Sequence, residues 1–489
     1  MNHETALLTV SQMGEADRLT EASGIPSYVM MDKAGTAVAA EINRRWSCRA
    51  ITVLCGPGNN GGDGFVTAKR LTETGWPVRV ALLGSLEQLS GTALQHAQLW
   101  TDRIEPLTPK VLEGAQLVVD ALFGAGLSRA LAGQAAETLA AAADRALPII
   151  AIDVPSGMMG DTGEALGAVA ACLTVTFFRK KPGHLLLPGR LLCGKVVVAD
   201  IGTPISVFER IVPKSFENHP NLWLAELPKP IEIHHKYQRG HALISGGYPM
   251  TGSARMAAKA AARAGAGLTT IAVSEIAFPI YAAALTSIMV HPLTSPDDFI
   301  RLLTDSRFTA FLIGPGASIS QMTRTRAIAM LSSGRPTLLD ADAITAFQDN
   351  PSVLYKAITV ACILTPHDGE FARIFDTSGD KLTRTRAAAL RSGAIIVLKG
   401  CDTVITAPDG CSVINANAPP TLATAGSGDV LSGIILGLLA QGMQPFLAAA
   451  AGVWLHGAAA TEFGPGLIAE DLPDLLPRVL RRLFQHSAV

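Results

Sequence analysis

The chain has 489 residues, of which 48% are hydrophobic and 17% charged, and its formal net charge is −1 at pH 7. This length predicts two or more domains, and the near-neutral charge argues against partners held by a broad electrostatic field, such as nucleic acid or an acidic membrane. The seven cysteines stand singly, without a C-x-x-C pair, so neither a zinc site nor a disulfide framework is expected.

The N-terminal stretch MNHETALLTVSQMGEADRL lacks the basic start and long apolar run of a secretory signal. The most apolar segment, VLSGIILGLLAQG, is too short and too rich in glycine to cross a membrane. We therefore expect a cytoplasmic protein.

The first half of the chain alternates apolar, β-branched runs with alanine-rich stretches that suit helices. The runs predict strands at 51–54, 78–83, 117–120, 148–153, 175–178 and 196–201. Continuous apolar strands separated by helices indicate a parallel sheet covered on both faces, a doubly wound, three-layer α/β fold. The pattern fades where Pro, Asn and charged residues gather, which places a first domain at 1–215 and a linker at 216–230.

Polar residues follow three of these predicted strands, where ligands bind in open parallel sheets. The first loop, CGPGNNGGDGF, satisfies G-x-G-x-x-G, but the acidic residue that a redox Rossmann domain places at the end of the next strand is missing; Glu87 comes several positions late. The oxygens of Asn60, Asp120 and Ser156 suit a hard cation, and Asp153 is placed for proton transfer or for gripping a hydroxyl. The alternative is that these residues only form turns and helix starts.

A second alternation of strands and helices fills 231–489 and shares no motif order with the first. In ATAGSGDVLSG, Gly426, Ser427 and Gly428 allow backbone N–H groups to converge on a transferring phosphoryl group, and Asp429 is poised to accept a proton. Helix initiation alone is the alternative for Asp429. The stretch KGCDTVI follows a predicted strand and could cradle nucleotide phosphate through Lys399 and Thr403. His234, His235 and His456 are interpreted as core or capping residues, and MAAKAAARAGAG as a packing stripe.

The motifs GPGNNGGDG, VVDALFGAG, DVPSG and KKPGHLLLPGRLLCGKVVVADIG occur in this order over roughly residues 5–215. Together they closely resemble the N-terminal, Rossmann-like domain of bifunctional NAD(P)H-hydrate repair enzymes, which epimerises hydrated NADH and NADPH. The resemblance implies a potassium ion held by Asn60, Asp120 and Ser156, and Asp153 as the proton-transfer group. It implies hydrate binding by Asn59, Asn60, Gly61, Gly62, Asp63, Gly124, Ala125, Gly126, Leu127, Ser128, Arg129, Ala130 and Asp153. Two places depart from the family pattern: Asp32 and Lys33 stand where L-M-E-N-A-G is usual, and Ala125 replaces the threonine of G-T-G.

In the second half, GPG at 314–316, TPHDGEFARIF, KGCDT and GSGDVLSG resemble the hydrate dehydratase branch of the ribokinase-like superfamily, over about 235–485. The resemblance implies that ADP phosphorylates the hydroxyl of the S hydrate and that phosphate then leaves, restoring NAD(P)H. Ser253, Gly316, His367 and Asp429 would contact the hydrate, with Asp429 as base. Nucleotide contacts would come from Lys399, Gly400, Cys401, Asp402, Thr403 and Gly428. Magnesium is implied by the phosphate chemistry, and a homo-oligomer by the habits of the family.

Two other readings stay open: a ribokinase-like small-molecule kinase whose N-terminal domain only binds a ligand, and a non-catalytic scaffold in the first domain. The sequence does not choose between ADP and ATP. Nor does it rank NADH against NADPH hydrate, because no arginine pair is identifiable as a clamp for the 2′-phosphate.

Overall fold

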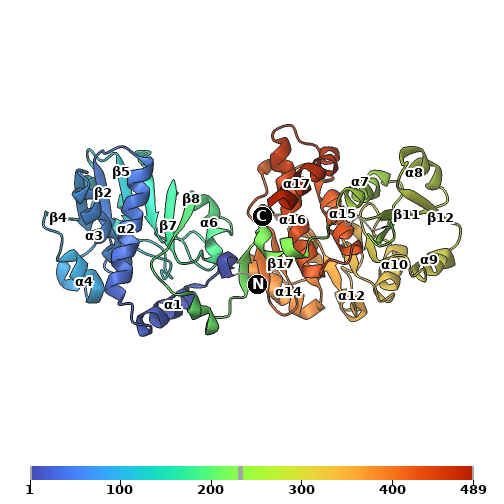
Figure 1. Cartoon of the computed structure of the whole chain (residues 1–489), viewed down its shortest axis with the longest axis horizontal. Coiled ribbons are helices and arrows are strands. Elements are labelled where there is room, and N and C mark those ends of the chain that lie inside the picture. The colour runs from blue at the N-terminus through green and yellow to red at the C-terminus, as the bar shows by residue number, and fades with distance from the viewer. Residues whose placement is uncertain (1–2, 230–234, 487–489) are drawn as a thin grey trace. The chain divides into compact units, whose positions relative to one another are not determined.

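The computed structural model describes residues 3–229 and 235–486, so His234 lies outside the described residues. The chain divides into two compact units, which we call the first unit (Ala6–Ser215) and the second unit (Phe216–Val489 with the residues before Ala6). Each unit is an α/β structure with a largely parallel sheet, as the strand and helix alternation predicts (Figure 1).

The sheet of the first unit is parallel throughout, in the order β4-β3-β2-β5-β6-β7-β8. Chain order reverses between β2 and β5, which makes their carboxyl ends the switch point where ligands bind in such sheets. The strands are β2 (Ile51–Cys55), β3 (Val78–Leu82), β4 (Ile104–Pro106), β5 (Leu117–Ala121), β6 (Ile149–Ile152), β7 (Leu173–Phe177) and β8 (Lys195–Ala199); a short β1 (Ala6–Leu7) precedes them.

Helices cover both faces of this sheet. Val53 of β2 packs with the core residues of α2 and α3, whereas its neighbour Leu54 packs with those of α5 on the opposite face. This alternation is the pleat of a strand buried on both sides, and it confirms the three-layer prediction. The helices are α1 (Val10–Ala22), α2 (Ser27–Arg45), α3 (Asn59–Glu73), α4 (Gly91–Ala97), α5 (Gly133–Asp144) and α6 (Gly189–Leu192).

The second unit has the strand order β9-β18-β17-β16-β15-β14-β13-β10-β11-β12. Its pairs are parallel from β16 to β12, and β17 and β18 add an antiparallel hairpin. The switch point lies between β10 and β13. The strands are β9 (Ser215–Glu217), β10 (His241–Ser245), β11 (Leu268–Ser274), β12 (Met289–Leu293), β13 (Ala310–Ile313), β14 (Thr337–Leu339), β15 (Cys362–Leu364), β16 (Ile395–Leu398), β17 (Val404–Thr406) and β18 (Ser412–Ile414).

The alanine-rich stripe predicted for packing forms α7, which lies against α15 (Figure 1). A Cβ added at Gly433 or Gly437 of α15 would come within 2.1 or 2.4 Å of a carbonyl oxygen of α7, so the two backbones are in contact. The helices of this unit are α7 (Thr251–Arg263), α8 (Phe278–Ala284), α9 (Pro296–Leu303), α10 (Gln321–Leu331), α11 (Ala341–Thr345), α12 (Pro351–Ala357), α13 (Asp368–Ile374), α14 (Lys381–Ser392), α15 (Ser427–Ala440), α16 (Pro445–Phe463) and α17 (Leu472–His486).

The described part of the predicted linker, 216–229, belongs to the second unit rather than standing free. The indole of Trp223 is fully buried, packs edge-on against Trp454 and donates a hydrogen bond to the Asn218 side chain. Burial of an indole and pairing of a buried amide fasten this segment to the unit it enters. Among the described helices, none is long and apolar enough to cross a membrane.

Candidate active sites

A cavity of about 620 Å³ opens at the switch point of the first unit. Its lining includes the predicted residues Asn59, Asn60, Asp63, Gly124, Ala125, Gly126, Leu127 and Asp153, joined by Asp17, Met31 and Lys181. The predicted residues Gly61, Gly62, Ser128, Arg129 and Ala130 do not line it. The structure therefore brings most of the first predicted cluster around one space.

The segment Asn59–Asp63 is the first turn of α3 rather than a free loop. A Cβ at Gly56 would come 1.7 Å from the Leu122 carbonyl oxygen, and one at Gly61 would come 1.9 Å from that of Gly56. These glycines thus let the turn between β2 and α3 press against the chain leaving β5. The unpaired N–H groups at the start of α3 face the same end of the sheet, where they favour negative charge.

Asp120 and Ser156 form a tight buried pair beyond β5. The Ser156 hydroxyl donates to Asp120 Oδ1 at 2.6 Å, the Ser156 N–H donates to Oδ2 at 2.8 Å, and the Phe123 N–H donates to the Ser156 oxygen at 2.8 Å. Burial raises the pKa of Asp120, although these hydrogen bonds and one from Leu122 oppose the rise. No basic side chain in the described part of the chain forms an ion pair with it.

The residues predicted for potassium fit a cation of that kind. A buried carboxylate without a counterion needs one when it is ionised, and Asp120, Ser156 and the Phe123 carbonyl supply hard oxygens. The Asn60 amide lies on the cavity wall: its oxygen would be 3.6 Å from a Cβ at Gly124, and its nitrogen is buried without a hydrogen-bond partner.

Asp153 is the best-connected side chain of the cavity, and its backbone has a φ of 68°. The Lys181 ammonium lies 2.5 Å from its Oδ1, where the Thr176 hydroxyl also donates, and the Ala125 N–H donates to Oδ2 at 3.1 Å. Burial by itself would raise the pKa of Asp153, but Lys181, with smaller contributions from His184 and the Ala125 N–H, holds the pKa below its usual value. The carboxylate is therefore ionised and oriented at neutral pH.

His184 fixes the backbone of Asp153. Its Nδ1 accepts the Lys181 N–H at 2.9 Å, so Nε2 carries the proton and donates to the Asp153 carbonyl oxygen at 2.9 Å. Burial and the neighbouring Lys181 lower the pKa of His184 to about 4, so the ring is neutral. A neutral imidazole whose two nitrogens are both hydrogen-bonded supports the left-handed backbone at Asp153 and does not exchange protons itself.

Two further carboxyl groups face the cavity. Burial, together with the charges of Asp153 and Asp17, raises the pKa of Asp63 well above its ordinary value. Burial also raises the pKa of Asp17, with Lys181 opposing and Asp153 adding to the rise. Lys181 acts on Asp153 and Asp17 but not on Asp63, so the cavity favours the neutral form of Asp63 while Asp153 stays charged.

The departures from the family pattern leave these contacts intact. Ala125 acts through its N–H, which any residue provides. Asp32 forms an ion pair with Arg70 at 2.9 Å, away from Asp153, and the Lys33 ammonium lies beside Gly202. Neither substitution removes a cavity-lining contact of Asp153.

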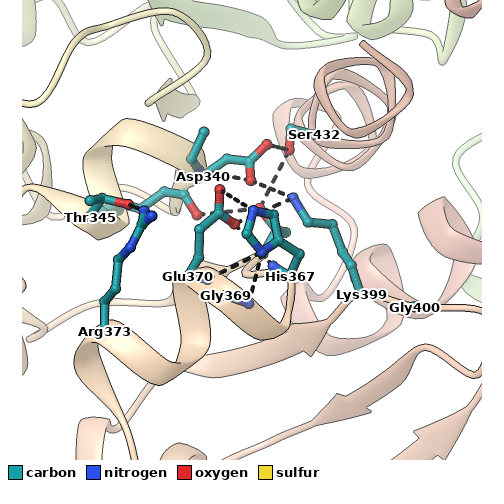
Figure 2. A network of polar contacts seen from close by, with 12 residues as sticks. Asp340, Thr345, His367, Gly369, Glu370, Arg373, Lys399, Gly400 and Ser432 are labelled. Atoms are coloured by element: carbon teal, nitrogen blue, oxygen red, sulfur yellow. Dashed lines mark hydrogen bonds and ion pairs between the residues drawn. The ribbon is translucent and has the colours of Figure 1, made fainter. Parts of the chain in front are cut away.

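The second unit gathers a network of charges at the ends of β14, β15 and β16 (Figure 2). The Lys399 ammonium lies 2.8 Å from Asp340 Oδ1 and 3.9 Å from Glu370 Oε2, and the Ser432 hydroxyl donates to Asp340 Oδ2 at 2.7 Å. Burial would lower the pKa of Lys399, but Asp340, Glu370 and Asp429 raise it, so the ammonium stays charged. It is a fixed positive charge at the start of α15.

The predicted base Asp429 and the loop before it lie beside this charge. Gly428 approaches so closely that an added Cβ would be 3.4 Å from Lys399 Nζ, and Gly426, at the N-cap of α15, has a φ of 84°. Burial raises the pKa of Asp429 to about 6, with a hydrogen bond from Ser253 opposing and Asp340 adding to the rise. The structure therefore joins Ser253, Asp429, Gly428 and Lys399, which are distant in sequence.

Gly316 lies at the switch point between β10 and β13. A Cβ at Gly247 would come 1.6 Å from the Gly316 carbonyl oxygen, and Gly316 itself has a φ of 66°. His367 caps α13: its Nδ1 accepts N–H groups of Gly369 and Glu370, while its Nε2 lies 3.3 Å from Glu370 Oε1. His367 therefore caps the helix while its ring remains more than half exposed for a ligand.

The predicted phosphate loop KGCDT is held by its own contacts. Thr403 Oγ1 accepts the Gly400 N–H at 3.2 Å, Asp402 pairs with Lys381 at 2.7 Å, and Cys401 is exposed. The Thr403 hydroxyl also donates to the Gly400 carbonyl oxygen at 2.8 Å, so Thr403 closes the turn of this loop.

The remaining histidines differ from one another. His456 is a buried core residue, as interpreted from the sequence. Burial lowers the pKa of its ring to about 4. His235 is exposed and packs against the Tyr237 ring.

The sequence motifs contained several site residues that were not assigned a role. Lys181 and His184 stand in KKPGH, and Glu370 in TPHDGE, within stretches quoted for the resemblance. Asp340 ends a predicted strand in TLLDADA, and a carboxylate at that position is itself a signal of a site.

Comparison with known proteins gives matches along nearly the whole chain. Residues 241–480 match the family described as NAD(P)H-hydrate dehydratase, and residues 27–183 match the YjeF-related protein N-terminus. The bifunctional NAD(P)H-hydrate repair enzyme Nnr of Moorella thermoacetica is 37% identical, over 98% of this chain and 97% of its own length. The enzyme of the same name from Coxiella burnetii is also 37% identical, over 96% and 98%, and that of Escherichia coli is 34% identical, over 94% and 90%. A crystal structure of ADP/ATP-dependent NAD(P)H-hydrate dehydratase from Bacillus subtilis, with ATP and Mg²⁺, covers 55% of this chain and 98% of its own, at 30% identity and a TM-score of 0.49.

Proposed function

The chain belongs to the family of bifunctional NAD(P)H-hydrate repair enzymes, and on this basis we propose that each of its two units carries out one step of the repair. The first unit interconverts the R and S hydrates of NADH and NADPH. The second dehydrates the S form at the expense of ADP. This order has a chemical reason, because a stereospecific dehydratase leaves the other epimer behind unless an epimerase feeds it.

In the first unit, Asp153 is the proton-transfer group. Lys181 keeps its carboxylate ionised, and the Ala125 N–H orients it. The carboxylate lines the cavity, so it can take a proton from the hydrate and return it. The hydrate lies along the start of α3 and the segment after β5, where Asn59 and Asp63 provide hydrogen-bond partners. Asn60, Asp120 and Ser156 hold potassium, which supplies positive charge beside the bound ligand.

In the second unit, Asp429 is the base. With a pKa of about 6 it is mostly ionised at pH 7, and it takes the proton from the ring hydroxyl of the S hydrate as that oxygen attacks the β-phosphorus of ADP. The P–O bond to AMP breaks, giving AMP and the phosphorylated hydrate. Loss of phosphate and of the proton on the neighbouring ring carbon then restores NAD(P)H. Phosphorylation converts hydroxide, a poor leaving group, into phosphate.

The surrounding groups stabilise charge during the transfer. The N–H groups at the start of α15 and the Lys399 ammonium face the negative charge of the phosphoryl group. Ser253, Gly316 and His367 contact the hydrate, and the loop Lys399–Thr403 contacts the nucleotide. In the described part of the chain, no three His, Cys, Asp or Glu side chains gather as a metal cage. Mg²⁺ would be held chiefly by the nucleotide phosphates and would neutralise their charge.

The observation that carries this proposal is the convergence of Asp429, Gly428 and Lys399 at a helix start, in a chain whose relatives share the whole two-domain length. The test gives purified protein the S hydrate with ADP. Reduced-nicotinamide absorbance should return while AMP and phosphate form in equal amounts. A stable phosphorylated product would indicate a small-molecule kinase instead.

A further inference from the structure

A second cavity, of about 640 Å³, runs along α7 in the second unit. We call it the α7 groove; its lining includes Arg255, Lys259 and Arg263, with Leu285, Ile288 and Glu470 opposite them. We propose that the α7 groove holds the phosphate-bearing adenosine half of the dinucleotide hydrate while the nicotinamide ring reacts at Asp429. This inference rests on the proposed function and extends it to the part of the substrate that does not react.

The groove begins where the reactive cluster ends. Gly252 lines it, and the next residue, Ser253, donates a hydrogen bond to Asp429. Met256 also lines it, and a Cβ at Gly426 would come 2.6 Å from the Met256 methyl carbon, so the groove adjoins the anion-binding loop. Lys399, directly after β16, and Gly428 of α15 do not line the groove, so the groove leaves the donor side free for ADP.

The three basic residues repeat every fourth position and so share one face of α7. At 1.5 Å per residue, Arg263 lies about 15 Å along the helix from Ser253. A dinucleotide that enters the groove beside Gly252 and Met256 would therefore carry its diphosphate past Arg255 and its adenosine ribose toward Arg263. The spacing matches a long, multiply phosphorylated ligand better than a single anion.

Of the three basic side chains that line the groove, two have an acidic partner and Arg255 has none among the described residues. Lys259 and Arg263 pair with Asp474 at 2.7 and 2.9 Å. Arg255 forms no ion pair with any described residue, and its Nε is buried without a hydrogen-bond partner. A guanidinium in this state is suited to bidentate binding of a phosphate. Glu470 offers an acceptor to ribose hydroxyls, and Leu285 and Ile288 form an apolar wall for a base.

The experiment measures dehydration by wild type, Arg255→Gln and Arg255→Lys with NADH hydrate, NADPH hydrate and the hydrate of reduced nicotinamide riboside, which lacks phosphate and adenosine. We expect Arg255→Gln to raise KM for both dinucleotide hydrates about 10- to 100-fold, the cost of a charged hydrogen bond, with kcat within about twofold. Arg255→Lys should recover part of the loss. Both variants should turn over the riboside hydrate at the wild-type rate.

The matched control is Arg307→Gln, an exposed arginine that does not line the groove and should leave all constants unchanged. An unchanged KM for the dinucleotide hydrates, or an equal loss with the riboside hydrate, would overturn the proposal. Failure of wild type to dehydrate any hydrate would instead refute the proposed function, so the two failures are separable.

Discussion

Replacing Lys181 by Met removes the one ammonium that lies against Asp153 while keeping the volume of the buried stem. The Lys181 side chain is only 4% exposed, so water cannot take its place. Removing one partner of a buried ion pair costs about 3–5 kcal/mol, because the remaining carboxyl group stays buried without the charge that compensated its burial. At about 2–4 °C per kcal/mol for a unit of this size, the melting temperature of the first unit should fall by roughly 6–20 °C.

The effect on catalysis follows from the protonation of Asp153. In the wild type its pKa lies below the ordinary value, so the carboxylate is ionised at neutral pH, and the stability that the pair contributes is lost only as the pH falls through that lowered pKa. Without Lys181, burial raises the pKa of Asp153, and the neutral acid cannot accept a proton. Epimerisation at pH 7 should fall by about 100-fold or more, and the deficit should narrow as the pH rises.

The assay follows the R-to-S conversion by chromatography from pH 6 to 9, with Lys195→Met, an exposed lysine on β8, as the matched control. Dehydration of the S hydrate by the second unit should be unaffected. A Lys181→Met protein that epimerises at the wild-type rate at pH 7 would refute the reasoning. A deficit that is the same at every pH would show that Lys181 acts only on structure.

Three further outcomes are expected. Asp429→Asn should abolish dehydration and leave epimerisation intact. The wild-type dehydration rate should decline as the pH drops through about 6, because Asp429 becomes protonated there. A flat pH profile of dehydration would contradict the role of Asp429 as base. In the wild type, potassium in place of sodium should accelerate epimerisation and raise the melting temperature, and Asp120→Asn should remove both effects. If the variant keeps both effects, the cation site is wrong. Gly247→Ala should lose dehydration, because the new Cβ would be 1.6 Å from the Gly316 oxygen; wild-type dehydration by this variant would contradict a role for that close contact.

The strands of both sheets were predictable where they are long and apolar, because full burial requires continuous hydrophobic runs. The short edge strand β4, with the sequence IEP, and the hairpin of β17 and β18 carry too few residues for such a signal. Asn59–Asp63 was expected as a loop because Asn and Gly favour turns; packing against the chain after β5 makes it helical instead.

The candidate sites were predictable only in part. Asp153 and Asp429 stand within motifs, so the sequence alone was enough to predict a role for each, and both roles stay predictions. The contacts of Lys181 with Asp153, and of Asp340 with Lys399 and Ser432, join residues 28, 59 and 92 positions apart, and depend on which strands are neighbours. The burial of Trp223 was likewise hidden, because Pro, Asn and charged residues around it resemble a linker.

The most direct measurement is a time course of both epimers after the purified protein is mixed with R and S hydrate, excess ADP, Mg²⁺ and potassium. We expect the S form to disappear first, the R form to follow to completion, and NAD(P)H to account for both. If the R form persists at its spontaneous rate of conversion after S is exhausted, the first unit does not feed the second, and the two-step account is wrong.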